Sequence, residues 1–327
     1  MEKVSIIVPV YGIEKFIKRC AVSLFEQTYS NIEYIFVDDA TPDGSIEIVN
    51  SVLGSYPKRA DNVKIVHHQH NKGLSGARNT GLENVTGDFV LHVDGDDYLE
   101  LNAVEKLIGF IHQEYADIVI FDYYTVKKGG RTPTYLKYSE KSSYIHDILV
   151  KNVSPSIWNK MYSVKLYNSG YDTLSVEGIN HGEDYATTPR LLYYADKVKK
   201  LDLPLYNYVQ YNENSYTQNI TAKSVESMCK ADLEIFRFFK DRHVDGLDIP
   251  LVLYMAMLRT KTGLLKRRNR SLYPMINDLY KDIPADYVKR LPVSDQVLLK
   301  MVTHGWYRCA SIYCKMGLAV KKVFFAI

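Results

Sequence analysis

Residues 4–10 of the chain read VSIIVPV, a nearly continuous apolar run with many β-branched side chains. Such a run is typical of a strand that is buried on both faces of a parallel sheet. Similar short runs follow along the chain, at 32–37, 63–66, 88–93 and 118–121. Segments with helical spacing of apolar residues separate them, at 13–24, 74–84 and 103–111. This alternation predicts an α/β fold whose mainly parallel sheet is flanked by helices.

The second half of the chain has a different pattern. Residues 127–156 are polar and rich in tyrosine, and they predict no regular element. A helical segment within 182–195 is followed by an extended one at 198–208. Long helical segments then dominate, at 225–239, at 251–265 and from 297 to the end. We therefore expect a sheet domain at 1–220 and a helical C-terminal extension at 221–327.

The composition is that of an ordinary globular protein. The 327 residues are 46% hydrophobic and 24% charged, and a net charge of +3 is too small to indicate a nucleic acid partner. The four cysteines lack the spacing of zinc ligands and of a disulfide framework, which fits a reducing cytosol. Met1 leads directly into the first strand, and no uncharged apolar stretch reaches the roughly 18 residues of a transmembrane helix. We therefore expect a cytoplasmic protein.

Residues 90–97 read VLHVDGDD, so a predicted strand ends in three carboxylates within four residues. Like charges at this spacing repel one another, and folding alone does not explain them. A bound Mg²⁺ or Mn²⁺ would explain them, because hard divalent cations prefer oxygen ligands. The alternative is a solvated acidic turn after the strand. We call Asp94–Asp97 the acidic turn.

Polar residues also follow the first two predicted strands. Tyr11 follows the first strand, and Asp38 and Asp39 end the second. In a parallel sheet, ligands bind beyond the carboxyl ends of the strands. We therefore expect Tyr11, Asp39 and the acidic turn to lie at one edge of the sheet, around a ligand.

Five segments in a fixed order resemble the family 2 glycosyltransferases, particularly bacterial enzymes that build capsules and lipopolysaccharide. They are VSIIVPVYG at 4–12, FVDDATPDGS at 36–45, NKGLSGARNTGLENVTGDFVLHVDGDDYL at 71–99, WNKMY at 158–162 and GEDYATTPRLLYYA at 182–195. Each segment is weak alone, whereas the ordered set is specific. The resemblance covers roughly residues 1–215 and implies the GT-A nucleotide-diphospho-sugar transferase fold, with a Rossmann-like sheet.

The resemblance also implies an activity. Enzymes of this family move a sugar from a nucleotide-diphosphate sugar to an acceptor hydroxyl, usually with inversion. UDP-sugars are the commonest donors, and the acceptor here would be a saccharide or a lipid-linked saccharide. By the same resemblance, Pro9, Val10 and Tyr11 would line the nucleotide base, and Asp39 would bind the base or the ribose.

The family's acidic motif corresponds to Asp94, Asp96 and Asp97. Asp94 and Asp96 form its Asp-x-Asp pair, and Asp97 extends it. A Mn²⁺ or Mg²⁺ ion held there would bridge the donor diphosphate and neutralise the departing nucleotide. We favour Asp96 as the direct metal ligand, supported by Asp94 and Asp97.

An inverting transfer needs a base that takes the proton from the attacking hydroxyl. By resemblance to the family, that base is Asp184. The alternative is that Glu183 and Asp184 simply occupy the first turn of a helix, where the macrodipole favours acids.

Three further basic residues each have two interpretations. Lys72 or Arg78 could approach the nucleotide, with the amides of a helix start nearby to favour anions. Alternatively, Arg78 pairs with an acidic neighbour and organises Asp39 or the acidic turn. Lys160 could contact a phosphate or the acceptor, or belong to a structural corner that Trp158 anchors.

The C-terminal extension contains two basic groups of residues. One group is Lys261, Lys266, Arg267, Arg268 and Arg270, and in the other Ile312, Met316, Val320, Phe324 and Phe325 alternate with Lys315, Lys321 and Lys322. A basic amphipathic helix can lie on an anionic membrane surface, which would suit a lipid-linked acceptor at the inner face of the cytoplasmic membrane. The alternative is packing against the catalytic domain or against a partner subunit in a homo-oligomer.

Processive members of the family contain a Gln-x-x-Arg-Trp motif and membrane helices, and because this chain has neither, transfer of one sugar is expected. Two other functions compete with this one. A nucleotidyltransferase also uses a nucleotide, carboxylates and a metal, but residues 8–12 lack the glycine-rich basic loop expected of that class. A non-catalytic nucleotide-sugar-binding protein with the same fold would not need both the acidic turn and Asp184.

Overall fold

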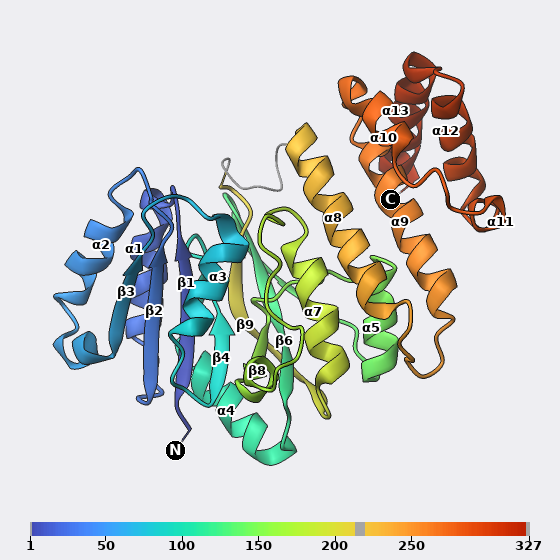
Figure 1. Cartoon of the computed structure of the whole chain (residues 1–327). Helices are drawn as coiled ribbons and strands as arrows, with labels where there is room; N and C mark the ends of the chain where they lie inside the picture. Colours follow the sequence, from blue (N-terminus) through green and yellow to red (C-terminus); the bar gives the residue numbers. More distant parts are fainter. Residues whose placement is uncertain (1, 213–219, 325–327) are drawn as a thin grey trace. The chain divides into compact units, whose positions relative to one another are not determined.

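The computed structural model describes residues 2–212 and 220–324, with side chains up to Met316 (Figure 1). The chain forms two compact units. Unit 1 consists of Met1–Ile145 and Pro155–Ser215, and unit 2 consists of His146–Ser154 and Tyr216–Ile327. Unit 2 thus includes a short segment from the middle of the chain as well as the C-terminal region.

Unit 1 is built on a sheet of nine described strands in the order β3-β2-β1-β4-β8-β6-β9-β5, with β7 paired to β6. The strands are β1 Val4–Val10, β2 Ile32–Asp38, β3 Val63–His67, β4 Phe89–His92, β5 Tyr98–Leu99, β6 Ile118–Lys127, β7 Gly130–Thr134, β8 Lys160–Ser163 and β9 Val198–Val209. Strands β1 to β4 pair in parallel. The rest of the sheet is mixed, because β8 is antiparallel to both β4 and β6. The predicted α/β fold is confirmed, and its continuous parallel part consists of the N-terminal strands β1 to β4.

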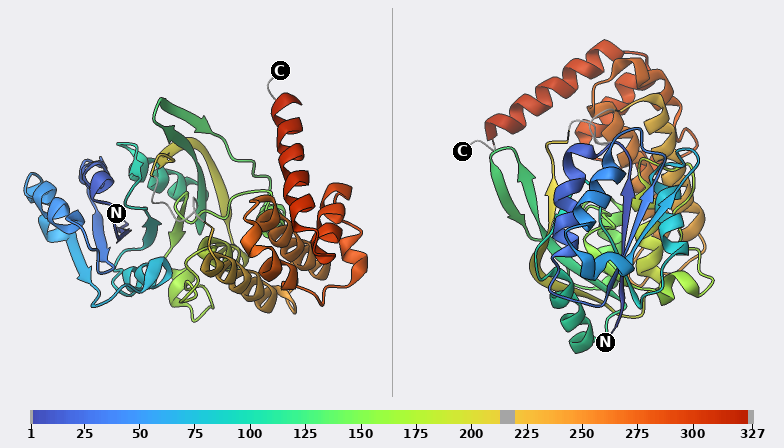
Figure 2. Two further views of the ribbon diagram at one scale, coloured as in Figure 1. Left: turned by 90° about the horizontal axis from the view of Figure 1, so that it is seen from above. Right: turned by 90° about the vertical axis from the view of Figure 1, so that its left-hand side faces the viewer.

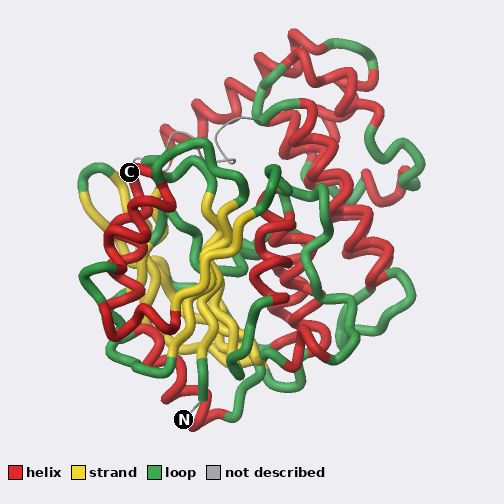
Figure 3. Tube along the Cα trace, turned by 60° about the vertical axis from the view of Figure 1, so that its left-hand side comes forward, coloured by secondary structure: helices red, strands yellow, loops and turns green. Residues whose placement is uncertain are grey.

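Helices lie on both faces of this sheet (Figure 3). In unit 1 they are α1 Glu14–Phe25, α2 Ser45–Leu53, α3 Gly73–Glu83, α4 Ala103–Glu114, α6 Lys165–Asn168 and α7 Glu183–Tyr194, with the 3-10 helix η1 at Pro57–Asn62. Helix α5, Lys141–Leu149, spans the boundary between the two units. The helices of the N-terminal half fall between the strands, as the alternating pattern predicts.

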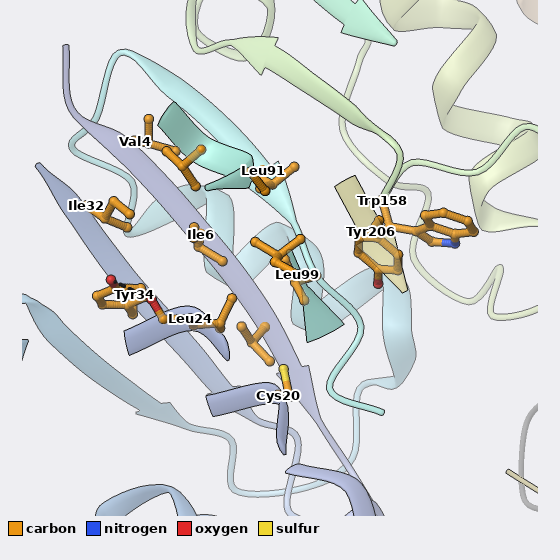
Figure 4. Close-up of a cluster of buried hydrophobic side chains, with 14 of the residues drawn as sticks. Val4, Ile6, Cys20, Leu24, Ile32, Tyr34, Leu91, Leu99, Trp158 and Tyr206 are labelled. Carbon is orange, nitrogen blue, oxygen red and sulfur yellow. Dashed lines mark hydrogen bonds between the residues drawn. The ribbon is translucent and has the colours of Figure 1, made fainter. Parts of the chain in front are cut away.

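One face of the sheet forms the main core of unit 1 (Figure 4). Alternate residues of neighbouring strands point to this face, as Figure 4 shows for Val4 and Ile6 of β1 and Leu91 of β4. Helices α1, α2 and α4 contribute the other side of this core. Ile7 points to the opposite face, where α3 contributes Ala77. Strand β1 is therefore buried on both faces, as its sequence predicts.

The tyrosine-rich stretch at 127–156 contains regular structure that the sequence did not predict. Strand β6 continues to Lys127 and turns back into β7, with Lys127 paired to Gly130. Figure 2 shows this β6–β7 hairpin in green, extending from the sheet in the right-hand view. The paired residues are mostly polar, and those of β7 are mostly exposed, so the run lacks the apolar alternation by which strands are predicted.

All regular elements among the described residues of unit 2 are helices. Its helices are α8 Ala222–Phe239, α9 Ile249–Lys266, α10 Tyr273–Asp278, α11 Ala285–Val288, α12 Val293–Thr303 and α13 Tyr307–Phe324, with the 3-10 helix η2 at Arg270–Leu272. The prediction of one helix from Val297 to the end is wrong. Gly305 has a positive φ of 73°, a conformation that ends helices, and it separates α12 from α13.

The described part of α13 has an exposed apolar side. Ile312 and Met316 are both exposed. Val320, Phe324, Phe325, Lys321 and Lys322 of the predicted amphipathic face lie outside the described side chains. Among the described residues, no helix combines the length and the apolar character needed to cross a bilayer.

Helix α3 approaches β1 so closely that a side chain at Gly81 has no room. A Cβ added there would lie 2.4 Å from Cγ2 of the buried Ile7. We predict that Gly81→Ala lowers the free energy of unfolding by about 1–3 kcal/mol, because the core is overpacked. The loss should occur although alanine favours a helix over glycine by about 1 kcal/mol. Urea unfolding measures it.

The matched control is Gly109→Ala in α4, where an added Cβ meets nothing within 4 Å. This substitution should stabilise the protein by up to about 1 kcal/mol through helix propensity alone. Equal effects of the two substitutions would contradict the close packing of α3 on β1.

Candidate active site

The acidic turn follows β4 and is held in place from several sides. The amide of Asp97 donates to Asp94 O at 2.9 Å, which closes the turn. The amide of Asp94 donates to the Tyr206 hydroxyl of β9 at 3.1 Å. Glycine suits position 95, because a Cβ there would lie 2.2 Å from Cδ1 of Ile13 and 3.1 Å from Pro9 O, so that Ile13 would have to move. The repulsion between the carboxylates is thus opposed by a rigid backbone.

Asp97 faces the protein interior. Its side chain is almost fully buried, and it accepts hydrogen bonds from the Tyr206 hydroxyl at 2.8 Å and from the Val209 amide at 2.7 Å. Burial, followed by the charges of Asp96 and Asp94, raises the pKa of Asp97 well above its ordinary value. These contacts attach the acidic turn to β9, and they occupy both oxygens of the carboxyl group.

Asp96 has fewer protein partners than Asp97. Its Oδ2 accepts a hydrogen bond from Asn212 Nδ2 at 2.8 Å. Burial and the neighbouring charge of Asp94 raise the pKa of Asp96 to about 6. Within the described residues, no ion pair joins Asp96 to a basic side chain. Asp96 is therefore a carboxylate whose ionised form an added cation would stabilise.

Arg78 joins the acidic turn to the start of α7. Its guanidinium donates to Asp94 Oδ1 at 3.0 Å, to Asp184 Oδ1 at 2.7 Å and to Glu183 Oε1 at 3.2 Å. Burial by itself would lower the pKa of Arg78, but the three carboxylates raise it above its ordinary value. Only 2% of the side chain is exposed, so Arg78 is not a surface cation open to a nucleotide. These contacts favour the interpretation in which Arg78 pairs with acidic neighbours and organises the acidic turn.

Asp184 lies in the first turn of α7, after Gly182 in a left-handed conformation. Its Oδ2 accepts a hydrogen bond from the Ile157 amide at 3.3 Å, and 19% of its side chain is exposed. Burial raises the pKa of Asp184, and Arg78 opposes this change. Glu183, which is more buried, also has a raised pKa, from burial and from the charge of Asp184. The predicted position of Glu183 and Asp184 in the first turn of a helix is thus confirmed. At this position the Asp184 carboxylate also contacts the Arg78 guanidinium.

Asp39 has extensive contacts within the protein. Its carboxylate lies 2.7 Å from His68 Nδ1 and accepts hydrogen bonds from the amides of Lys72 at 2.7 Å and Gly73 at 2.9 Å. Only 3% of Asp39 is exposed. Asp39 therefore holds the N-terminus of α3, and the predicted contact with a base or ribose stays a prediction. The exposed side chain of Lys72 is not used in this interaction.

The three residues predicted to line the base differ in their exposure. Tyr11 is 46% exposed, and Pro9 is half-buried. Val10 is fully buried in the main core, and its predicted place beside a nucleotide base stays a prediction that this burial does not favour. Alternate residues of a strand point to opposite faces, and Val10 shares the core face with Val4 and Ile6. The carbonyl of Val10 accepts a hydrogen bond from the Asp39 amide at 3.1 Å.

The segment around Trp158 is a structural corner. The Trp158 ring stacks on Tyr206 at 4.5 Å between centroids and on Tyr208 at 5.1 Å. Figure 4 shows Trp158 and Tyr206 beside each other. Lys160 is fully buried, and its ammonium donates to Ser156 O at 2.6 Å and to Asn159 Oδ1 at 2.8 Å. These contacts favour the structural interpretation of Lys160 over a phosphate contact.

Arg19 of α1 is a candidate site residue that the sequence analysis did not identify. Its guanidinium lies 4.1 Å above the ring of Tyr98 and donates to the Tyr211 hydroxyl at 2.9 Å. Its Nε and Nη2 atoms are buried and have no hydrogen-bond partner among the described residues. Its charge also favours the ionised form of Asp96. In the sequence Arg19 is one polar position of an amphipathic helix, and only long-range folding brings it to Tyr98 and Tyr211.

Comparison with known proteins identifies the family of this chain. Residues 5–173 match the family described as Glycosyl transferase family 2. The uncharacterized glycosyltransferase EpsJ of Bacillus subtilis is 35% identical over 226 residues, which cover 66% of this chain and 63% of EpsJ. Glycosyltransferase GlyA of Streptococcus pneumoniae is 31% identical over 230 residues, which cover 63% of this chain and 30% of GlyA. The chain belongs to glycosyl transferase family 2, and it spans less than two thirds of these two relatives.

Solved structures support the same fold. A crystal structure of S. aureus TarS in complex with UDP-GlcNAc has a TM-score of 0.75 at 20% identity and covers 96% of this chain and 92% of that chain. Mannosyltransferase PcManGT from Pyrobaculum calidifontis, in complex with GDP-Man and Mn²⁺, has a TM-score of 0.55 at 16% identity and covers 98% and 87%. The GT-A fold expected from the sequence is confirmed.

We predict that Arg78→Met lowers the free energy of unfolding by about 3–5 kcal/mol, because three partly buried carboxylates lose their shared cation. Chemical unfolding at pH 7.5 measures this loss. Lys199→Met is the control in the same unit, because Lys199 forms an exposed pair with Glu114 at 3.3 Å. The control should cost less than about 1 kcal/mol. A small effect at Arg78 would contradict its role as the common counter-ion.

Proposed function

We propose that the chain is a glycosyltransferase that moves one sugar from a nucleotide-diphosphate sugar to an acceptor hydroxyl, with inversion and with a divalent cation. The observation that carries the proposal is the position of Arg78 between Asp94 of the acidic turn and Asp184. In this proposal the acidic turn would hold a metal-bound diphosphate next to Asp184, the candidate base. Such proximity is what a direct displacement at the anomeric carbon requires.

The acidic turn suits a divalent cation that the donor helps to bind. Within the described residues, no three His, Cys, Asp or Glu side chains could hold a metal ion by themselves. Mg²⁺ sites of this kind use one or two carboxylates, and substrate phosphates complete the coordination. Asp96 would bind the ion directly with support from Asp94, whereas Asp97 is occupied by Tyr206 and Val209. When bound, Mn²⁺ or Mg²⁺ would stabilise charge on the departing diphosphate.

Asp184 has the properties of a general base. A base works best when its pKa lies nearer the working pH than that of an ordinary carboxylate, and burial raises the pKa of Asp184 in this direction. Arg78 and the Ile157 amide fix the orientation of the carboxylate. Both oxygens keep further acceptor capacity, so an acceptor hydroxyl could donate to one of them.

The donor proposed here is a UDP-sugar, and the complex of TarS with UDP-GlcNAc supports this choice. The proposed nucleotide side of the site consists of Pro9, Tyr11, Asp39 and Lys72. We propose a role in cell-surface polysaccharide synthesis, in line with the resemblance of the sequence to bacterial enzymes of the family that build capsules and lipopolysaccharide. The acceptor would be a saccharide or a lipid-linked saccharide on the cytoplasmic side of the membrane. A homo-oligomer and peripheral membrane contact through the C-terminal helices stay predictions.

We predict that Asp184→Asn lowers the rate of sugar transfer by about 10²–10⁴-fold, because the base is lost. The Kd for UDP with Mn²⁺ should change little. A transfer assay with a panel of UDP-sugars, together with calorimetric titration of UDP, measures both effects. Asp202→Asn is the control, since Asp202 is exposed and lies outside the site. Loss of UDP binding in Asp184→Asn would remove Asp184 from the base role, and the absence of any transfer would favour a binding protein.

The cation site should depend on pH through Asp96. Protons compete with a metal for this carboxylate, and its pKa is about 6. We predict that Mn²⁺ binding in the presence of UDP is about tenfold weaker at pH 5 than at pH 7.5. Asp96→Asn should abolish Mn²⁺ binding at both pH values. Electron paramagnetic resonance of Mn²⁺ measures the bound fraction.

Asp96→Asn, which should abolish metal binding, should nevertheless stabilise the metal-free protein. A raised carboxyl pKa stabilises the fold at a pH below the unfolded value of about 4 and loses that contribution as the pH rises through about 6. Asp96→Asn should therefore stabilise the metal-free protein at pH 7.5 and have little effect at pH 4. Destabilisation at pH 7.5 would contradict the assignment of Asp96 as an uncompensated carboxylate.

A further inference from the structure

Unit 2 contains a cavity that the proposed transfer reaction does not use. Its volume is about 660 Å³, within the roughly 300–1,000 Å³ of small-molecule sites. The lining comes from α9, α10 to α12 and the segment between α10 and α11, which are orange to red in Figure 1. All of these residues belong to unit 2, so the cavity is described independently of the sheet and its acidic turn.

The walls of the cavity are mainly apolar. Ile283, Val293 and Val297 line it, and they come from the segment before α11 and from α12. Val293 is 75% exposed, which is unusual for a large aliphatic side chain at the edge of a concave surface. A ligand with a hydrocarbon part would remove these side chains from water.

The polar side of the cavity is basic. Lys261, Lys281 and Lys300 line it, and none of the described lining residues is acidic. Lys281 pairs with Asp278 at 2.7 Å, but both side chains are more than 60% exposed, so this pair is weak. The lysines therefore present positive charge to a ligand beside an apolar wall.

Lys261 is the lysine that the fold positions most firmly. It is 9% exposed, and its ammonium donates to Asn277 O at 2.8 Å and to Leu279 O at 2.7 Å. An ammonium has three donors, and these are the two bonds that it makes within the described residues. The remaining donor is available to an anion in the cavity. Burial, together with the charge of Lys281, lowers the pKa of Lys261, and an anion would reverse this effect.

We propose that this cavity binds an amphiphile with a phosphate headgroup and a single hydrocarbon chain. The lysines would hold the phosphate as point charges, and the chain would pack against Ile283, Val293 and Val297. A neutral amphiphile leaves the lysines without a counter-ion, and a free phosphate leaves the apolar wall in water. Only a ligand that has both an anionic headgroup and a hydrocarbon chain meets both requirements. The proposal does not depend on the glycosyltransferase activity.

Calorimetric titration of the full-length chain with three probes tests the proposal. The probes are dodecyl phosphate below its micelle-forming concentration, dodecyl maltoside, which has the same chain and a neutral head, and inorganic phosphate. Dodecyl phosphate should bind with one molecule per chain and at least about tenfold more tightly than either of the others. Equal binding of dodecyl maltoside would show an unspecific apolar surface, and equal binding of inorganic phosphate would show a simple anion site. Either result overturns the proposal.

Two sets of substitutions locate the binding. Lys281→Met combined with Lys300→Met removes exposed charges, so the fold should be kept, and affinity for dodecyl phosphate should fall at least about tenfold. Val297→Trp fills the cavity and should weaken binding similarly. Lys289→Met is the control, because Lys289 forms the same kind of exposed pair, with Asp286 at 2.8 Å, outside the cavity. Unchanged binding in the first two variants, or equal loss in the control, overturns the proposal.

Discussion

The arrangement of the site depends on one buried cation among several carboxylates. Arg78 contacts Asp94, Glu183 and Asp184, and its side chain is almost completely removed from solvent. Carboxyl groups thus outnumber cations here, and burial raises the pKa values of Glu183, Asp184 and Asp96. A protein gains little stability from such an excess, because burial makes every unpaired charge costly. The excess is explained if a divalent cation enters this region together with its ligand.

The backbone around Arg78 is fixed by contacts that have no direct role in chemistry. Tyr206 of β9 contacts both Asp94 and Asp97, so the acidic turn cannot relax away from the sheet. Asp39 holds the first amides of α3, which is the helix that presents Arg78. Stacking of Trp158 on Tyr206 extends the same support toward Ile157, whose amide contacts Asp184. The two halves of the site are therefore positioned by one connected set of contacts.

Much of this could be predicted from the sequence, and the limits have physical reasons. The buried strand at 4–10 and the carboxylates after β4 follow from local patterns, and their ordered combination indicated the family. The burial of Val10 follows from the alternation of side chains along β1, which the family motif at 4–12 does not express. The contacts of Arg19 with Tyr211 and of Asp96 with Asn212 join residues that are far apart in the chain, and no local pattern encodes them. An acidic partner for Arg78 was one of two interpretations of the sequence, but the sharing of Arg78 by three carboxyl groups was not predicted. The β6–β7 hairpin was missed because its paired residues are mostly polar and lack an apolar period.

A double-mutant cycle tests most directly whether Arg78 couples the two halves of the site. The free energy of unfolding would be measured for Asp94→Asn, for Asp184→Asn and for the double variant. Either single substitution leaves Arg78 with two carboxylates, whereas the double variant leaves only Glu183. We therefore predict that the double variant loses more stability than the sum of the single losses, by at least about 0.5 kcal/mol. Additivity within about 0.3 kcal/mol would contradict the coupling, and with it the account of this site.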